Sequence, residues 1–130
     1  MKIPAATAIL IVLTMLSPSA FAENFLEKCP CGPSSIKGPI RLLFMQGHRG
    51  ADFRGPCRKH DYCYDTLGMP KTECDDCFLV DLLATCDDSK NPKMARFKAK
   101  LAFWLVQNFG NGAYRSAQFH AGEGLLSATK

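Results

Sequence analysis

The stretch Cys57-Arg58-Lys59-His60-Asp61-Tyr62-Cys63-Tyr64 decides how this chain folds. On a helix with 3.6 residues per turn, positions 57, 60, 61 and 64 share one face. That face carries a cysteine, a histidine, a carboxylate and a tyrosine, which are Cys57, His60, Asp61 and Tyr64. A proline precedes this stretch and a glycine follows it at residue 68, so we predict a helix over residues 56–67.

A second cysteine-rich stretch, residues 74–86, follows after a short turn. We predict a helix over residues 73–87 whose inner face is lined by Asp75, Phe78, Leu79, Leu82 and Cys86. If cysteines staple the two helices side by side, Asp75 comes to lie against His60. We interpret this meeting of a histidine and a carboxylate as the feature around which the protein is organised.

A third helix is predicted over residues 92–109, because apolar side chains recur there at intervals of three and four residues. We expect that stripe to face the core; it comprises Met94, Phe97, Leu101, Trp104, Leu105 and Asn108. The Gly110-Asn111-Gly112 run should end the helix, with a short helical turn at 114–119 and a frayed tail from Gly122. With no strong strand signal, we predict a mostly α protein: a small disulfide-stapled domain of two antiparallel helices that carry the His/Asp pair, plus a third amphipathic helix.

Residues 1–22 have the features of a secretory signal peptide: a lysine near the start, an apolar run over residues 8–16 and the cleavage motif Ala20-Phe21-Ala22. An uncleaved anchor is the alternative. The predicted mature domain, residues 23–130, contains all 7 cysteines, which is typical of exported proteins stabilised by disulfides. We therefore expect a secreted protein, extracellular or periplasmic. The net charge of +4 favours an anionic surface as partner and is too small to indicate nucleic acid.

Residues 55–64, then Gly68, Lys71 and the run Cys74-Asp75-x-x-Phe78, closely resemble the secreted phospholipase A2 family. The family's pattern is C-x-x-H-D-x-C-Y, a short turn with a glycine, and then C-D-x-x-F. The match covers residues 55–86 and is thinner outside them. It implies a phospholipase A2-like domain over residues 23–130 that hydrolyses the sn-2 ester of glycerophospholipids in a calcium-dependent reaction, releasing a fatty acid and a lysophospholipid.

The resemblance implies a role for each polar residue of the two helices. His60 is the expected general base, because an imidazole titrates near neutral pH and can take a proton from the attacking water. Asp75 is expected to bind the other ring nitrogen and stabilise the imidazolium, as the acid does in a serine triad. Tyr64 is expected to donate to Asp75. Asp76 is the alternative partner of His60, although we interpret it and Asp81 as solvated carboxylates.

The same resemblance implies a calcium site. Asp61 is the expected carboxylate ligand, and the backbone carbonyls of Pro30, Gly32 and Ser34 are expected to complete the oxygen shell of the ion. The start of this loop, Cys29-Pro30-Cys31-Gly32, resembles the family's C-x-C-G, but other residues replace its later glycines. Residues 47–52 are the alternative loop.

Two disulfides follow from the resemblance, Cys31–Cys57 and Cys63–Cys74. Cys29, Cys77 and Cys86 have no assigned partner. Cys77 and Cys86 are nine residues apart on one predicted helix, about 13.5 Å, which is too far for a bridge. The alternative for Cys74-x-x-Cys77 is a redox pair or half of a zinc site.

A phospholipid membrane, anionic by preference, is the expected partner. The apolar run of residues 40–45 is interpreted as core, with a membrane-facing patch as the alternative. In that alternative the wedge is Ile40, Leu42, Leu43 and Phe44, flanked by Lys37, Arg41, Arg49 and Arg54. The alternative function is a non-catalytic lipid- or protein-binding module on the same scaffold. We favour the enzyme because His60, Asp61 and Asp75 are all present.

Overall fold

The structure is a computed structural model that describes residues 30–32 and 45–129. Its elements are a small hairpin, β1 (Gly47–His48) and β2 (Ala51–Asp52), followed by α3 (Arg54–Asp65), α4 (Lys71–Thr85), a 3₁₀ turn η2 (Cys86–Asp88), α5 (Pro92–Phe109) and α6 (Asn111–Ala128). The prediction of a mostly α protein is confirmed for this part of the chain. The predicted signal peptide and its cleavage site lie outside the described residues, as does the apolar run of residues 40–44.

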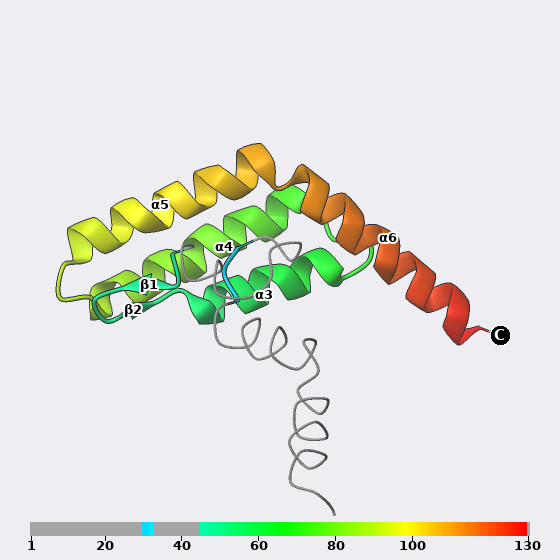
Figure 1. Cartoon of the computed structure of the whole chain (residues 1–130), viewed down its shortest axis with the longest axis horizontal. Coiled ribbons are helices and arrows are strands. Elements are labelled where there is room, and N and C mark those ends of the chain that lie inside the picture. The colour runs from blue at the N-terminus through cyan, green and yellow to red at the C-terminus, as the bar shows by residue number, and fades with distance from the viewer. Residues whose placement is uncertain (1–29, 33–44, 130) are drawn as a thin grey trace, which may run out of the picture.

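Helices α3 and α4 lie side by side and antiparallel, as predicted (Figure 1). The contacts between the two helices follow this antiparallel order. The end of α3 contacts the beginning of α4, and earlier residues of α3 contact later residues of α4: Cys63 bonds to Cys74, His60 to Asp75 and Lys59 to Asp81. The predicted inner face of α4 is confirmed, since Asp75, Phe78, Leu82 and Cys86 are buried and Leu79 is half-buried. The core between the helices centres on Phe53 and Leu82, both fully buried.

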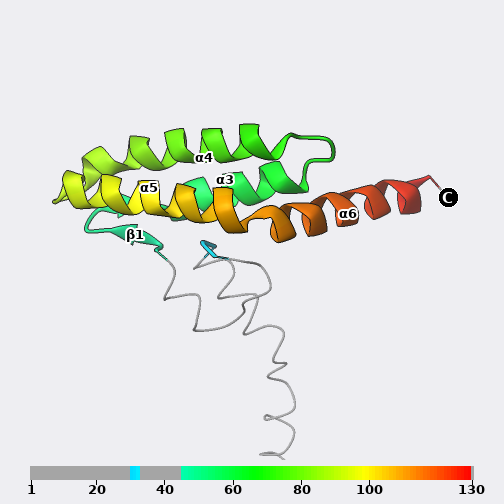
Figure 2. The ribbon, with the colours of Figure 1, turned by 90° about the horizontal axis from the view of Figure 1, so that it is seen from above.

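Helix α5 also packs alongside α4, and its bounds, Pro92–Phe109, agree with the prediction (Figure 2). The Asn91 side chain accepts a hydrogen bond from the Met94 N–H, and Pro92 occupies the first helical position, so the helix has a well-defined start. Val106 near its C-terminal end faces the meeting point of α3 and α4.

The hairpin is a feature that the sequence did not predict; residues 47–52 were considered as an alternative calcium loop. Arg49 and Gly50 both have positive φ, as a two-residue hairpin turn requires. Gly50 also approaches the Asp88 carbonyl so closely that a Cβ would lie 2.5 Å from it. The hairpin is held to the loop before α5, because Ser89 Oγ donates to the His48 carbonyl and the Lys90 N–H to the Arg49 carbonyl.

The prediction for the C-terminal segment is wrong. A short turn at 114–119 and a frayed tail were expected, but one helix, α6, runs from Asn111 to Ala128. Gly110 separates it from α5 without left-handed backbone, at φ −76°, so the chain bends and continues as helix. Helix α6 packs over the α3–α4 turn, where Gln118 Nε2 donates to the carbonyls of Tyr64 and Thr66.

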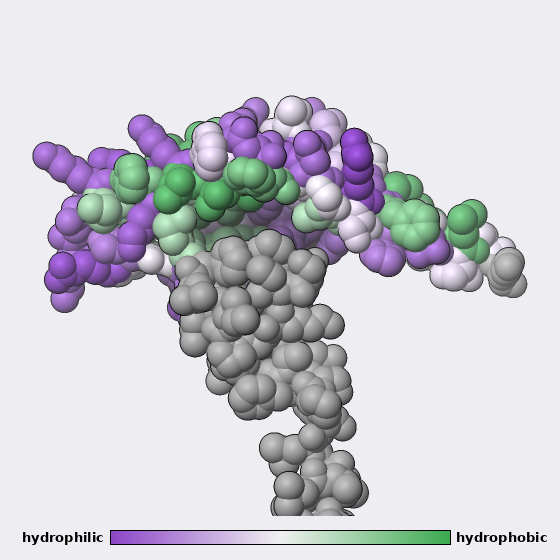
Figure 3. Space-filling model, turned by 45° about the horizontal axis from the view of Figure 1, so that its top comes forward, coloured by the Kyte–Doolittle hydropathy of each residue, from purple (hydrophilic) through white to green (hydrophobic). Residues whose placement is uncertain are grey.

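The prediction that the α5 stripe faces the core is also wrong. The buried side of α5 is made of small residues, Ala95 and Ala99, with Ala102 and Val106 packed beside them. The large apolar residues point outward: Phe97 is 63% exposed and Trp104 is 51% exposed. Figure 3 shows hydrophobic residues gathered in a green band on this side of the molecule. The reason is geometric, since α5 lies close to α4 and only small side chains fit between the two helices. No described helix is both long and apolar enough to cross a membrane.

Candidate functional site

His60 and Asp75 meet between α3 and α4. The distance from His60 Nε2 to Asp75 Oδ1 is 2.8 Å, and both side chains are buried, at 6% and 2% residue exposure. An ionised carboxylate only accepts hydrogen bonds, so we assign the proton to Nε2. The lone pair of the ring then lies on Nδ1, which makes no hydrogen bond within the part of the chain that the structure describes. This pairing agrees with the one predicted from the sequence.

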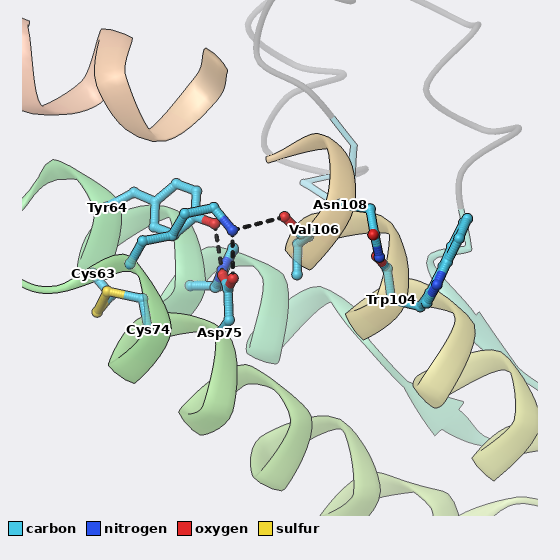
Figure 4. Close-up of polar contacts among 9 residues, drawn as sticks. Cys63, Tyr64, Cys74, Asp75, Trp104, Val106 and Asn108 are labelled. Atoms are coloured by element: carbon cyan, nitrogen blue, oxygen red, sulfur yellow. Dashed lines mark hydrogen bonds and ion pairs between the residues drawn. A yellow bond between two sulfur atoms is a disulfide. The ribbon is translucent and has the colours of Figure 1, made fainter. Parts of the chain in front are cut away.

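Two further donors hold Asp75. Tyr64 Oη donates to Oδ1 at 2.6 Å, as predicted, and Lys71 Nζ donates to Oδ2 at 2.6 Å. Lys71 Nζ also donates to the Val106 carbonyl of α5 at 2.9 Å. Figure 4 shows Tyr64, Asp75 and Val106 converging from α3, α4 and α5. Both oxygens of the buried carboxylate are therefore satisfied, and its charge has a cationic partner.

Aromatic rings enclose the imidazole of His60. Its centroid lies 4.2 Å from the Tyr64 ring and 4.5 Å from the Phe78 ring, which is tilted by only 30°. The residue is only 6% exposed, so the ring fills space between the helices. Truncation of His60 to alanine would leave a cavity, so a variant that keeps the volume is needed to test its chemistry.

The environment shifts the pKa values of His60, Asp75 and Tyr64, each in a defined direction. Burial lowers the pKa of His60, with Lys71 acting in the same direction and Asp75 against it. Burial alone would raise the pKa of Asp75, but the hydrogen bonds from Lys71, Tyr64 and His60 outweigh it and hold the pKa below its usual value. Burial and the neighbouring carboxylate raise the pKa of Tyr64, which keeps the phenol a donor. The group therefore combines a neutral histidine with a charged Asp75.

Asp61, the predicted calcium ligand, is exposed, whereas Cys57, His60 and Tyr64 on the same side of α3 are buried. It therefore lies at the edge of the predicted face. The Cys31–Cys57 disulfide holds residues 30–32 against α3 one helical turn before Asp61, with a Cα–Cα distance of 5.2 Å. Gly32 has φ +109°, a left-handed conformation that favours glycine. Ser34 lies outside the described residues.

Both predicted disulfides are present, Cys31–Cys57 and Cys63–Cys74. Cys77 and Cys86 are free thiols, one exposed and one buried, so they do not bridge each other, as their spacing predicted. Because Cys74 is bonded to Cys63, the Cys74-x-x-Cys77 run is not a redox pair. No group of three or more histidine, cysteine or acidic side chains able to hold a metal occurs among the described residues. Cys29 is not among them.

Lys71 is the member of the site to which the sequence assigned no role. One signal could have indicated it: Lys71 precedes Asp75 by four residues, so the two side chains share a face of the predicted helix. Asp76, the alternative partner for His60, is exposed on α4 and does not contact the ring. Asp81 forms an ion pair with Lys59 at 2.8 Å, away from the histidine.

Comparison of the chain with models of known protein families, with curated proteins and with solved structures finds no match.

Proposed function

We propose that the protein is a calcium-dependent phospholipase A2 that hydrolyses the sn-2 ester of glycerophospholipids. The observation that carries the proposal is the buried hydrogen bond between His60 and Asp75, formed by residues of the sequence pattern that resembles the secreted phospholipase A2 family. A buried His–Asp pair with a third group behind it suits a base that must be oriented, charged and discharged in each turnover. The Tyr64 and Lys71 contacts to Asp75 add support.

In this proposal His60 Nδ1 takes a proton from a water molecule as the water oxygen attacks the ester carbonyl carbon. The imidazolium that forms is stabilised by ionised Asp75, which keeps its hydrogen bond from Nε2. When the carbon–oxygen bond of the ester breaks, the proton returns from Nδ1 to the departing alcohol oxygen. A fatty acid and a lysophospholipid are released, and the histidine is again neutral.

The donors near α3 fit calcium by their chemistry, because a carboxylate and backbone carbonyls are the oxygen ligands this ion prefers. Asp61 and the carbonyls of Pro30 and Gly32 would hold it, and Ser34 belongs to the same proposed set. The disulfide that ties residues 30–32 to α3 supports this assignment. Bound calcium would polarise the ester carbonyl and stabilise negative charge on its oxygen.

We further propose that an anionic phospholipid surface is the partner and that the chain is exported. The exposed apolar residues of α5 support membrane contact, because large apolar patches on a protein surface usually mark a binding site. Two disulfides support an oxidising compartment. Of the basic residues proposed beside residues 40–44, Arg49 is exposed at the hairpin turn and Arg54 pairs with Asp52. The wedge itself lies outside the described residues.

The deciding experiment measures sn-2 ester hydrolysis on mixed phospholipid vesicles by the wild type and by His60→Gln. Glutamine keeps an amide nitrogen for Asp75 but supplies no base at the Nδ1 position. We expect hydrolysis by the wild type and a loss of about 10²–10⁴-fold in the variant. Near-normal activity of a folded His60→Gln protein would reject the mechanism. Vesicle binding without any hydrolysis by the wild type would favour the non-catalytic module.

The calcium assignment is tested separately with Asp61→Asn. Calcium should raise the unfolding temperature of the wild type, because a ligand that binds the folded state stabilises it. The shift should be much smaller in the variant, and hydrolysis should require calcium. Full activity in excess chelator would exclude the calcium role.

A further inference from the structure

Lys71 stands at a position that two physical effects disfavour. It is the first residue of α4, where the partial positive charge of the helix N-terminus repels a cation. Its side chain is only 15% exposed, although lysine is normally solvated. The Lys→Asp order at i,i+4 is also the weaker orientation for a helix ion pair. The stability of helix α4 alone therefore does not explain the position of this ammonium group, and a contact outside the helix must do so.

That contact is a three-helix junction. Lys71 Nζ lies 2.6 Å from Asp75 Oδ2 and 2.9 Å from the carbonyl oxygen of Val106. The first bond stays within α4, and the second reaches α5. Asp75 Oδ1 accepts hydrogen bonds from His60 and Tyr64 of α3, and Oδ2 accepts one from Lys71 of its own helix, whose ammonium is fixed in turn by α5. The carboxylate cannot rotate about its side-chain torsions without losing one of these bonds.

A charged carboxylate that is 2% exposed is costly unless a cation or several donors compensate it. Without Lys71, Oδ2 would lose the donor that the structure gives it, and the carboxylate would be held through Oδ1 alone. With Lys71 bound to Oδ2, the charge of the carboxylate is compensated, and Oδ1 stays directed at Nε2 of His60. Lys71 thus balances the charge of Asp75, and His60 carries the lone pair on Nδ1.

We propose that Lys71 is a positioning residue: it orients Asp75 from the opposite oxygen and so holds His60 as the Nε2–H tautomer, with Nδ1 directed away from Asp75. The inference concerns the mechanism and therefore rests on the proposed function. Helix α5 contributes to this positioning, because the Val106 carbonyl accepts a second hydrogen bond from the Lys71 ammonium group and fixes its orientation.

The test combines three variants with two readouts. Lys71→Met removes the charge at similar length, Lys71→Arg keeps the charge, and Lys59→Met removes the exposed Lys59–Asp81 ion pair as a matched control. We expect Lys71→Met to lower kcat by about 10- to 100-fold with KM nearly unchanged, as loss of an orienting partner does. Lys71→Arg should recover much of kcat, and Lys59→Met should resemble the wild type.

The second readout is the ring of His60, followed by ¹⁵N NMR at one neutral pH, and it does not require turnover. The wild type should show a single Nε2–H tautomer and slow exchange of the Lys71 ammonium protons with water. Lys71→Met should show a tautomer mixture. If the wild-type ammonium exchanges like that of a solvent-exposed lysine, the inference is wrong even if Lys71→Met fails to fold.

A merely structural ion pair would behave differently: Lys71→Met would unfold at lower temperature but keep the Nε2–H tautomer and the kcat of the folded protein, which would overturn the inference. Failure of the proposed function is distinguishable from this outcome. It would appear as absence of hydrolysis in the wild type, with the tautomer effect of Lys71 still measurable.

Discussion

At the scale of single residues, the site depends on how one buried carboxylate is satisfied. Asp75 accepts hydrogen bonds from His60, Tyr64 and Lys71, which are all protein side chains. A hydrogen bond to a charged group contributes more to stability than a neutral one, so each donor should matter for both folding and geometry. Substitutions that remove one donor while keeping the ring or chain volume should separate these contributions.

Tyr64→Phe removes the hydroxyl that lies 2.6 Å from Asp75 and keeps the ring that packs on His60. We expect the free energy of unfolding to fall by about 1.5–3 kcal/mol, because a buried charged acceptor loses a donor. Urea denaturation measures the change. Tyr62→Phe is the control, since Tyr62 is 76% exposed on the same helix and should cost nothing measurable. Equal effects of the two variants would contradict the importance of the Tyr64–Asp75 bond.

Stability should also depend on pH through His60. Burial lowers the pKa of this ring in the folded protein, so below about pH 6.5 the unfolded chain binds the proton more readily. The contribution of His60 to the free energy of unfolding is therefore fully present above about pH 6.5 and decreases as the pH falls toward the folded-state pKa. Asp75, whose pKa is also lowered, adds a loss at more acidic pH.

Urea denaturation of the wild type and His60→Gln between about pH 8 and about pH 5 measures the contribution of His60. The variant lacks the titrating ring, so its stability should decrease less over this range. The same dependence on pH in both proteins would show that His60 is not the group responsible.

At the scale of elements, the close approach of α3 and the α5–α6 junction depends on Gly110. A Cβ on Gly110 would contact the Val106 carbonyl and lie 3.0 Å from Tyr64 Oη. The backbone of Gly110 is ordinary, with φ −76°, so the constraint is space and not conformation. This bend directs α6 across the α3–α4 turn, where Tyr114 Oη donates to the Met69 carbonyl.

Gly110→Ala should therefore destabilise the protein by about 1–3 kcal/mol, as overpacking of a tight contact does. Gly112→Ala is the matched control, because a Cβ there meets nothing within 4 Å and alanine is the better helix former. The control should leave stability unchanged or raise it by up to about 1 kcal/mol. Thermal or urea unfolding of the two variants measures both effects, and a neutral Gly110→Ala would contradict the packing described at the junction.

At the scale of the whole molecule, charge and apolar surface are concentrated in the last two helices. Helices α5 and α6 carry the basic residues Lys93, Arg96, Lys98, Lys100 and Arg115 against the single acidic Glu123. Exposed apolar residues accompany them, including Phe97, Trp104, Phe109 and Phe119. Basic and apolar side chains together are typical of helices that bind a lipid–water interface.

Trp104 is the only tryptophan of the chain and is 51% exposed, so its fluorescence reports on this surface alone. We expect its emission to shift to shorter wavelength on anionic vesicles and to change little on zwitterionic ones. His60→Gln protein should be used, so that the lipid stays intact. The double variant Lys93→Glu/Lys100→Glu should bind at least about tenfold more weakly, because each basic residue near an anionic surface contributes about 1 kcal/mol. An unchanged Trp104 emission on anionic vesicles would exclude this surface from docking.

The sequence by itself determined the three helices, to within two residues of their starts at Arg54, Lys71 and Pro92, and the pairing of His60 with Asp75. The two disulfides followed from the resemblance of this pattern to a known family. Local signals suffice for the helices and for the pairing of the two side chains. Apolar periodicity, prolines and caps mark helices, and the spacing of the histidine–aspartate pattern between cysteines places two side chains on facing surfaces. The enzymatic function and the calcium site remain predictions of that pattern.

Only the tertiary structure decided which face of α5 is buried, how far α6 extends and what Lys71 does. Periodicity finds a stripe of large apolar residues but does not tell whether the neighbouring helix leaves room for it; here the fully buried residues of α5 are the small Ala95 and Ala99. No residue of helix α6 is buried. A helix without a buried face needs no apolar stripe, so its sequence lacks the periodic pattern by which a packed helix is predicted. Lys71 takes its role from the Val106 carbonyl, 35 residues later in the chain, and a backbone oxygen leaves no trace in a sequence.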